Sequence, residues 1–80
     1  MKILVVEDDP VIAQTLQLLF ASYTYAVDIA VDGDAGLRMA DTYAYDLILL
    51  DLVLPTLDGI SVCQRLRAKG FQKPILLLTG

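Results

Sequence analysis

Three runs of four consecutive apolar residues constrain the fold of this 80-residue chain more than any other feature. They are residues 3–6 (ILVV), 47–50 (LILL) and 75–78 (ILLL). Continuous rather than alternating apolarity is typical of parallel strands that are covered on both faces. Residues 26–31 differ, because apolar side chains alternate there with Asp28, as they do on an edge strand. We therefore expect a parallel sheet of about four strands.

Amphipathic stretches that fit helices lie between these strands. We expect helices that begin at Asp9-Pro10, that run from about Asp34 to Thr42, and that run from Asp58 to Gly70. These boundaries carry suitable N-cap residues, a proline at a first helical position and a glycine after a helix end. The apolar residues expected to face the core are Ile12, Leu16, Leu19, Phe20, Leu37, Ala40, Ile60, Cys63 and Leu66. Strands that alternate with helices predict βαβ units with right-handed crossovers, and thus an α/β fold with three helices.

Composition excludes several classes of protein. The chain is long enough for one small domain, and its hydrophobic share of 56% is high for a domain of that size. Six basic and ten acidic residues give a net charge of −4, so no nucleic-acid footprint is visible. No apolar run approaches the ~20 residues of a membrane span. A single cysteine, Cys63, fits a reducing environment, and we expect a cytoplasmic protein without membrane contact.

Acidic residues directly follow two of the apolar runs. Glu7, Asp8 and Asp9 come after the first run, and Asp51 comes after residues 47–50. Ligands of open parallel sheets bind outside the carboxyl ends of the strands. If these two strands are neighbours, Glu7, Asp8 and Asp51 converge in one crevice, where they repel one another unless a cation neutralises them. Mg²⁺ suits such a crevice, because it takes one or two carboxylates and keeps several waters.

This arrangement also predicts a reaction. A carboxylate beside Mg²⁺ can accept a phosphoryl group, which makes Asp51 the candidate acceptor. Thr79 directly follows the last apolar run and could donate its hydroxyl to a phosphoryl oxygen. The plainer interpretations are that Glu7, Asp8 and Asp9 are a helix-start cluster favoured by the macrodipole, and that Thr79 is an ordinary strand-end residue. The four tyrosines, at positions 23, 25, 43 and 45, are expected to be packing residues with solvated hydroxyls.

Three segments carry a motif set that is specific only in combination: KILVVEDDP, DLILLDLVLPTLDG and KPILLLTG. They place an acidic pair after the first strand, an Asp followed by x-x-x-Pro-x-x-Asp-Gly after the third, and Lys-Pro before an apolar strand that ends in Thr. Together they resemble the receiver domain of two-component response regulators, and the resemblance runs along the whole chain without a gap. It implies the flavodoxin-like fold, here with strand order 2-1-3-4.

The resemblance implies a role for each candidate residue. Asp51 would accept the phosphoryl group from a sensor histidine kinase or a phosphotransfer protein. Asp8 and Asp51 would be direct Mg²⁺ ligands, and Glu7 would help through water. The backbone carbonyl of Val53 would complete the protein's share of the coordination. Thr79 would be the switch hydroxyl that moves toward the phosphate.

Other parts of the resemblance concern shape and role rather than chemistry. Pro55 and Asp58-Gly59 would shape the loop into the third helix, and the first helix would contribute to kinase docking. A receiver of this kind is a signalling switch of phosphorelay signal transduction. It catalyses its own phosphorylation and is not a metabolic enzyme.

The chain departs from the family at Gly80, where the sequence stops. The family continues through another helix, a fifth strand that ends in a phosphoryl-contacting lysine, and a final helix. Lys69 and Lys73 are not substitutes, because they flank a turn at the opposite end of the sheet. We therefore expect residues 1–80 to be a receiver domain that is incomplete at its C-terminus. Its fourth strand would be an exposed edge open to self-association, domain swapping or completion by a partner segment.

Other phosphate-handling classes fit less well. A haloacid-dehalogenase-type phosphatase needs a second Asp two residues after the nucleophile, where Val53 stands. A flavodoxin needs a Ser/Thr/Gly-rich loop after the first strand, where this chain has acids. The P-loop motif G-x-x-x-x-G-K is absent. The remaining alternative is a receiver-like interaction scaffold, or a folding and assembly fragment, that cannot be phosphorylated.

Overall fold

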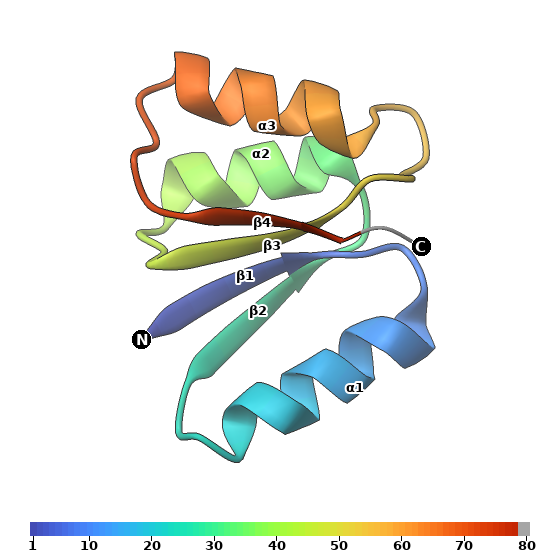
Figure 1. Cartoon of the computed structure of the whole chain (residues 1–80), viewed down its shortest axis with the longest axis vertical. Helices are drawn as coiled ribbons and strands as arrows, with labels where there is room; N and C mark the ends of the chain where they lie inside the picture. The colour runs from blue at the N-terminus through green and yellow to red at the C-terminus, as the bar shows by residue number, and fades with distance from the viewer. Residues whose placement is uncertain (79–80) are drawn as a thin grey trace.

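The computed structural model describes residues 1–78, which alternate between strands and helices (Figure 1). The elements are β1 (Lys2–Val6), α1 (Pro10–Ala21), β2 (Ala26–Ala30), α2 (Gly33–Thr42), β3 (Leu47–Asp51), α3 (Gly59–Ala68) and β4 (Ile75–Leu78). Thr79, the candidate switch residue, lies outside the described residues. The alternation confirms the predicted α/β fold.

All strand pairs in the sheet are parallel, and the order is β2-β1-β3-β4. Val6, at the end of β1, pairs with Ala30 on one side and with Leu50 on the other. The predicted strand order is therefore confirmed. Because β1 and β3 are neighbours in register, the residues that follow Val6 and Leu50 emerge side by side at the carboxyl edge of the sheet.

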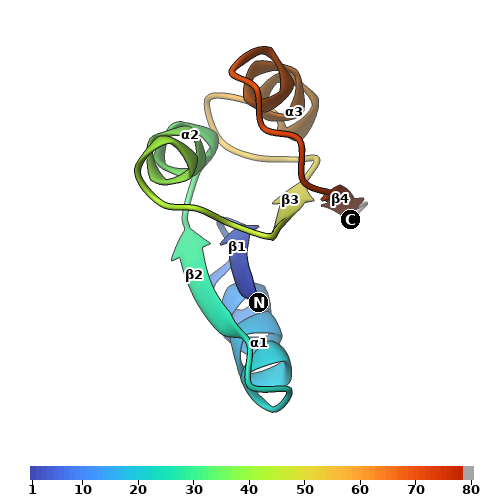
Figure 2. The same ribbon diagram turned by 90° about the vertical axis from the view of Figure 1, so that its left-hand side faces the viewer.

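The helices cover the two faces of the sheet unequally. Helix α1 lies on one face, and α2 and α3 lie side by side on the other (Figures 1 and 2). The β1 side chains alternate between these layers: Ile3 and Val5 pack in the α1 layer, and Leu4 and Val6 pack in the α2–α3 layer. All four are at most 1% exposed, so the continuous apolar run marks a strand buried on both faces, as predicted.

Helix α3 is rotated relative to the prediction. Ile60, expected to face the core, is 52% exposed, whereas Val62 and Leu66 are buried. The reason lies at the first residue of the helix. Gly59 is buried against the main chain at the end of β3, and this contact turns the side of the helix that includes Val62 toward the sheet.

Helix α2 agrees with the expected range, since it begins at Gly33 and ends at Thr42. Its N-cap is Asp32, which accepts a 2.7 Å hydrogen bond from Ala35 N–H. One expectation about α1 needs correction. In α1, the expected inward residues Ile12 and Leu19 are about half exposed, and Ala13 is the buried residue of the helix.

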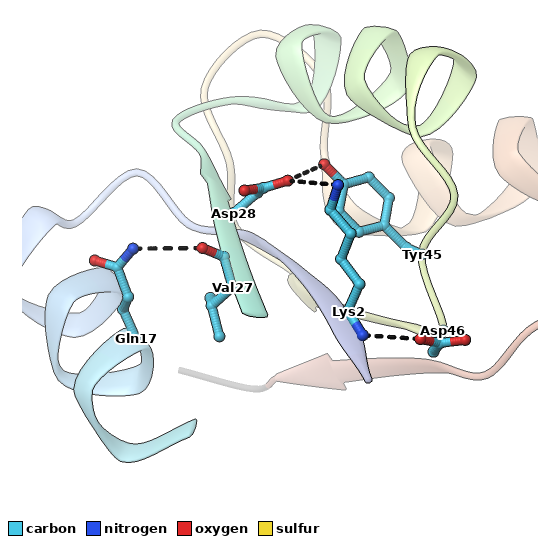
Figure 3. A network of polar contacts seen from close by, with 6 residues as sticks. All are labelled: Lys2, Gln17, Val27, Asp28, Tyr45 and Asp46. Carbon is cyan, nitrogen blue, oxygen red and sulfur yellow. Dashed lines mark hydrogen bonds and ion pairs between the residues drawn. The ribbon is translucent and has the colours of Figure 1, made fainter. Parts of the chain in front are cut away.

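Tyr45 departs from the expectation of a solvated hydroxyl. Its side chain is buried, and its hydroxyl donates a 2.7 Å hydrogen bond to Asp28 Oδ2 on the edge strand β2 (Figure 3). The Lys2 ammonium lies 3.8 Å from the same oxygen, and the Lys2 main-chain N–H donates to Asp46. These contacts join β1, β2 and the loop before β3 at the amino end of the sheet.

Among residues 1–78, no helix has both the length and the apolar character that crossing a membrane requires.

Candidate functional site

Three carboxylates meet at the carboxyl edge of the sheet. Glu7 and Asp8 directly follow β1, and Asp51 is the last residue of the neighbouring strand β3. One carboxylate oxygen from each side chain lies within 4.8 Å of those of the other two. The sequence prediction that these residues converge is therefore confirmed as geometry.

The three side chains differ in their access to solvent. Glu7 is only 4% exposed, Asp51 is partly exposed and Asp8 is exposed. Glu7 is held in place by its main-chain N–H, which donates a 3.0 Å hydrogen bond to the Ala30 carbonyl. Its side chain accepts a 3.2 Å bond from Asp9 N–H. Glu7 thus forms the floor of the cluster.

Burial raises the pKa of the Glu7 carboxyl group. Loss of solvation raises the pKa of Glu7 from 4.5 to about 7, and the nearby Asp51 and Asp8 side chains also raise it. The hydrogen bond from Asp9 N–H acts in the opposite direction. In the absence of a cation, Glu7 is therefore protonated in a substantial fraction of molecules near neutral pH.

The cluster has the donor set of a site for a hard divalent cation. Neither of the ion pairs found among residues 1–78, Lys2–Asp28 and Lys69–Asp41, involves a carboxylate of the cluster. Its charge is therefore balanced only by solvent, protons or a bound ion. Carboxylate oxygens at this spacing fit Mg²⁺, which prefers oxygen ligands and retains several waters.

Asp51 is positioned by the loop that follows it. Its Oδ1 accepts a 3.1 Å hydrogen bond from Val53 N–H, and the Val53 side chain points into solvent. Leu52 N–H donates to the carbonyl of Leu78, the last described residue of β4. The metal-ligand role of the Val53 carbonyl and the switch role of Thr79 stay predictions.

The loop contains two features that the sequence analysis did not assign. Thr56 has a φ of +65°, an unusual conformation for a β-branched residue, while Leu57 N–H donates 2.7 Å to the Pro55 carbonyl across it. Gly59 meets the main chain of Asp51 and Leu52. In the sequence, the glycine that directly follows the N-cap Asp58 could have indicated that two main-chain segments lie close together here.

The lysines near β4 lie where the sequence predicted. Lys69, the C-cap of α3, forms a 2.6 Å ion pair with Asp41 in the last turn of α2. Lys73 lies in the turn that leads into β4, and its carbonyl accepts a hydrogen bond from Arg67. Both are at the amino end of the sheet, away from Asp51.

Comparison with known protein families decides the family. The model of the response regulator receiver domain matches residues 3–80. The chain belongs to this family. Receiver domains are signalling switches rather than metabolic enzymes.

Two curated proteins are similar to this chain along its whole length. Protein RcaC of Microchaete diplosiphon is 52% identical over 80 residues, and the transcriptional regulatory protein DltR of Streptococcus agalactiae is 49% identical over 80 residues. These matches cover 100% of this chain but only 12% and 36% of the two relatives. This chain thus spans a minor part of the length of these curated relatives.

A solved receiver supports the same assignment. The response regulator TrrA of Thermotoga maritima, whose structure is in complex with Mg²⁺-BeF, is 35% identical and superposes with a TM-score of 0.93. The match covers 98% of this chain and 68% of TrrA. The receiver resemblance and the flavodoxin-like fold are therefore both confirmed.

Proposed function

We propose that this chain is a phosphoacceptor of two-component phosphorelay signalling that receives a phosphoryl group on Asp51. The donor would be the phosphohistidine of a sensor histidine kinase or of a phosphotransfer protein. The observation that carries the proposal is the convergence of Glu7, Asp8 and Asp51 at the carboxyl edge of a receiver fold. Residues 1–80 would act as the N-terminal portion of the receiver.

The transfer forms one bond and breaks one. A carboxylate oxygen of Asp51 attacks phosphorus, the P–N bond to the donor imidazole breaks, and its electron pair stays on the ring nitrogen, which is then protonated. Val53 N–H donates a hydrogen bond to Oδ1 of Asp51 and so orients the carboxylate. We propose that the Thr79 hydroxyl donates to a phosphoryl oxygen.

Mg²⁺ is the proposed cofactor, and when bound it would neutralise charge on the transferred group. Asp8 and Asp51 would hold the ion directly, Glu7 would act through water, and the Val53 carbonyl would be the main-chain ligand. The burial of Glu7 supports its indirect role, because a carboxylate at the floor of the cluster can accept hydrogen bonds from metal-bound water.

Intact-mass spectrometry tests the proposal. The chain is incubated with a small-molecule phosphodonor, with and without Mg²⁺, beside Asp51→Asn and the control Asp58→Asn. Asp58 is an exposed carboxylate that caps α3 and lies outside the cluster. We expect a Mg²⁺-dependent phosphoryl adduct in wild type and in Asp58→Asn but not in Asp51→Asn. Folded wild-type protein without an adduct would instead favour the alternative, a receiver-like scaffold that cannot be phosphorylated.

We propose that the kinase or phosphotransfer protein docks on α1. The outward face of this helix exposes Val11 and Leu18, which are 70% and 74% exposed and lie two turns apart. Helix α1 also begins directly after the acidic cluster, so a partner seated on it can reach Asp51. The proposed compartment is the cytoplasm, where Cys63 stays reduced.

We also propose that the fourth strand mediates self-association of the 80-residue chain. In the described sheet β4 is an outer strand without charged residues, and Leu76 and Leu77 are 52% and 40% exposed on opposite faces. Sedimentation equilibrium should show association that Leu76→Lys weakens. A wild-type monomer at all concentrations would contradict this part of the proposal.

A further inference from the structure

The start of α3 lies against the main chain of the proposed phosphoacceptor. A Cβ at position 59 would overlap the carbonyl oxygen of Asp51, and it would lie 2.8 Å from Leu52 Cα and 2.9 Å from the Asp51 carbonyl carbon. Non-bonded carbon atoms prefer separations of about 3.5–4.0 Å. Every one of these obstructing atoms belongs to the backbone, so no side-chain rotation can make room.

The backbone on both sides of this contact is anchored. Gly59 N–H donates a 3.0 Å hydrogen bond to the Leu52 carbonyl, and Leu52 N–H donates a 3.1 Å bond to the Leu78 carbonyl. The helix itself is fixed by Val62 and Leu66, which are buried in the hydrophobic core between the sheet and helices α2 and α3. A larger residue at position 59 would therefore force a displacement that the end of β3 must share.

On this basis we infer that Gly59 is a positioning residue for the phosphoacceptor: the absence of a side chain lets α3 seat against Asp51 and thereby fixes where its carboxylate lies relative to Glu7 and Asp8. This inference rests on the proposed function of the cluster. The inferred role goes beyond shaping the loop. Gly59 contacts the main chain of Asp51, the last residue of β3, and a shift of that main chain would also move the Asp51 carboxylate.

The geometry of a Mg²⁺ site makes such a displacement measurable. Mg²⁺ requires oxygen ligands at about 2.0–2.1 Å in near-octahedral arrangement. Groups that orient metal ligands typically change affinity by roughly 10- to 100-fold when they are altered. A loss of this size in Mg²⁺ affinity is therefore expected for Gly59→Ala, in addition to any loss of stability.

Two control variants separate positioning from simple packing. Gly36 is a buried glycine in the first half of α2, and the three heavy atoms nearest to a Cβ there are side-chain atoms of Val6, the nearest 2.9 Å away. Leu66→Ala removes core volume from α3 itself without pushing on β3. Both Gly36→Ala and Leu66→Ala should lower the free energy of unfolding, yet both should keep the Mg²⁺ affinity of wild type.

The experiment is a calorimetric Mg²⁺ titration of wild type, Gly59→Ala, Gly36→Ala and Leu66→Ala, each shown to be folded by circular dichroism. If Gly59→Ala is unfolded, it is titrated in trimethylamine N-oxide, which favours the folded state. A second variant inserts one glycine after Thr56, so that α3 can move away from Asp51 without overlap. The inference expects that this insertion also weakens Mg²⁺ binding. Wild-type affinity in both Gly59→Ala and the insertion would overturn it.

A metal-free readout keeps the inference separate from the proposed function. In ¹H–¹⁵N spectra recorded in EDTA, Gly59→Ala should shift the amide resonances of Asp51, Leu52 and Val53, and Gly36→Ala should not. Unshifted resonances would overturn the positioning role whatever the wild-type chain does with Mg²⁺. A wild-type chain that neither binds Mg²⁺ nor accepts a phosphoryl group would contradict the proposed function, while the shifts would still decide whether Gly59 positions Asp51.

Discussion

The buried hydroxyl of Tyr45 and the carboxylate of Asp28 are joined by a 2.7 Å hydrogen bond that ties the loop before β3 to the edge strand β2 (Figure 3). The Lys2 ammonium lies 4.7 Å from the centre of the Tyr43 ring and 5.4 Å from that of the Tyr45 ring, so it contacts both rings beside this hydrogen bond. Tyr45 lies before the first residue of β3, and Asp28 is in register with Ile48, three residues before Asp51. The hydrogen-bonded pair should therefore affect stability without affecting phosphorylation.

Tyr45→Phe should lower the free energy of unfolding by about 1–2 kcal/mol, because it removes a buried hydrogen bond to a charged acceptor and keeps the ring. Urea denaturation measures the loss. The control is Tyr43→Phe, in the same loop, whose half-exposed side chain should give little change. Equal losses in both variants would mean that the Asp28 bond contributes nothing specific.

The same bond predicts a dependence on alkaline pH. Burial, followed by the contact with Asp28, raises the pKa of Tyr45 above its ordinary value. The folded state therefore prefers the protonated hydroxyl, and its contribution is complete below the unfolded pKa of about 10 and is lost as pH rises above it. The difference in stability between wild type and Tyr45→Phe should shrink above that pH.

Glu7 predicts a second dependence on pH, in the acid range. Its pKa is raised from 4.5 to about 7 by burial and by the neighbouring carboxylates, so the folded state binds its proton more tightly than the unfolded state does. In EDTA, this contribution to stability is complete below the unfolded pKa and declines as pH rises through the folded pKa. Glu7→Gln should remove that decline. An unchanged pH profile in the variant would show that Glu7 is not the responsible group.

Asp51→Asn should stabilise the metal-free chain. The carboxylate oxygens of the cluster lie within 4.8 Å of one another, so removing one charge relieves repulsion between them. We expect the free energy of unfolding to rise by about 1 kcal/mol. Excess Mg²⁺ should raise the melting temperature of wild type, because it binds only the folded state, and should have much less effect on Asp51→Asn. Thermal denaturation with Mg²⁺ and with EDTA checks both parts, and an equal Mg²⁺ response in the two proteins would place the ion elsewhere.

Thr56→Gly should raise stability or leave it unchanged. Thr56 has a φ of +65°, where a β-branched side chain is strained and glycine is not. Relief of about 1–2 kcal/mol would offset the greater freedom of glycine in the unfolded chain. The matched control is Thr15→Gly inside α1, which should destabilise by several tenths of a kcal/mol. Thr56→Gly as damaging as Thr15→Gly would show that the loop stores no strain at this residue.

Leu18→Ala should slow phosphotransfer from a histidine kinase while leaving the reaction with a small-molecule phosphodonor unchanged. Leu18 is 74% exposed on α1, so its truncation removes surface for a protein partner and little core packing. Radiolabel transfer from a phosphorylated kinase, compared with small-molecule phosphorylation followed by mass spectrometry, separates the two reactions. A parallel loss in both would indicate damage to the chain rather than to docking.

The sequence predicted the features that depend on order along the chain. Continuous apolar runs identified β1, β3 and β4, and the alternation around Asp28 identified β2 as an edge strand. Once β1 and β3 are neighbours, residues that follow their ends must meet, so the convergence of Glu7, Asp8 and Asp51 could be predicted. The receiver family followed from the same segments.

Features that depend on how a helix or strand packs against its neighbours could not be predicted from the sequence. The rotation of α3, which buries Val62 instead of Ile60, is set by the contact of Gly59 with the end of β3. The raised pKa of Glu7 depends mainly on the burial of its side chain in the folded structure. The hydrogen bond of the Tyr45 hydroxyl depends on Asp28, which is distant in sequence and close only in the folded sheet.

The place of β1 in the sheet also has a consequence for synthesis. Ile3 and its neighbours are translated before either partner strand of β1, and Leu47, which pairs with Ile3, is made more than 40 residues later. At translation rates of about 5–20 residues per second, β1 therefore stays without its second partner strand for several seconds. We expect the nascent chain to expose the apolar residues 3–6 during this interval, and a transiently exposed apolar strand favours aggregation.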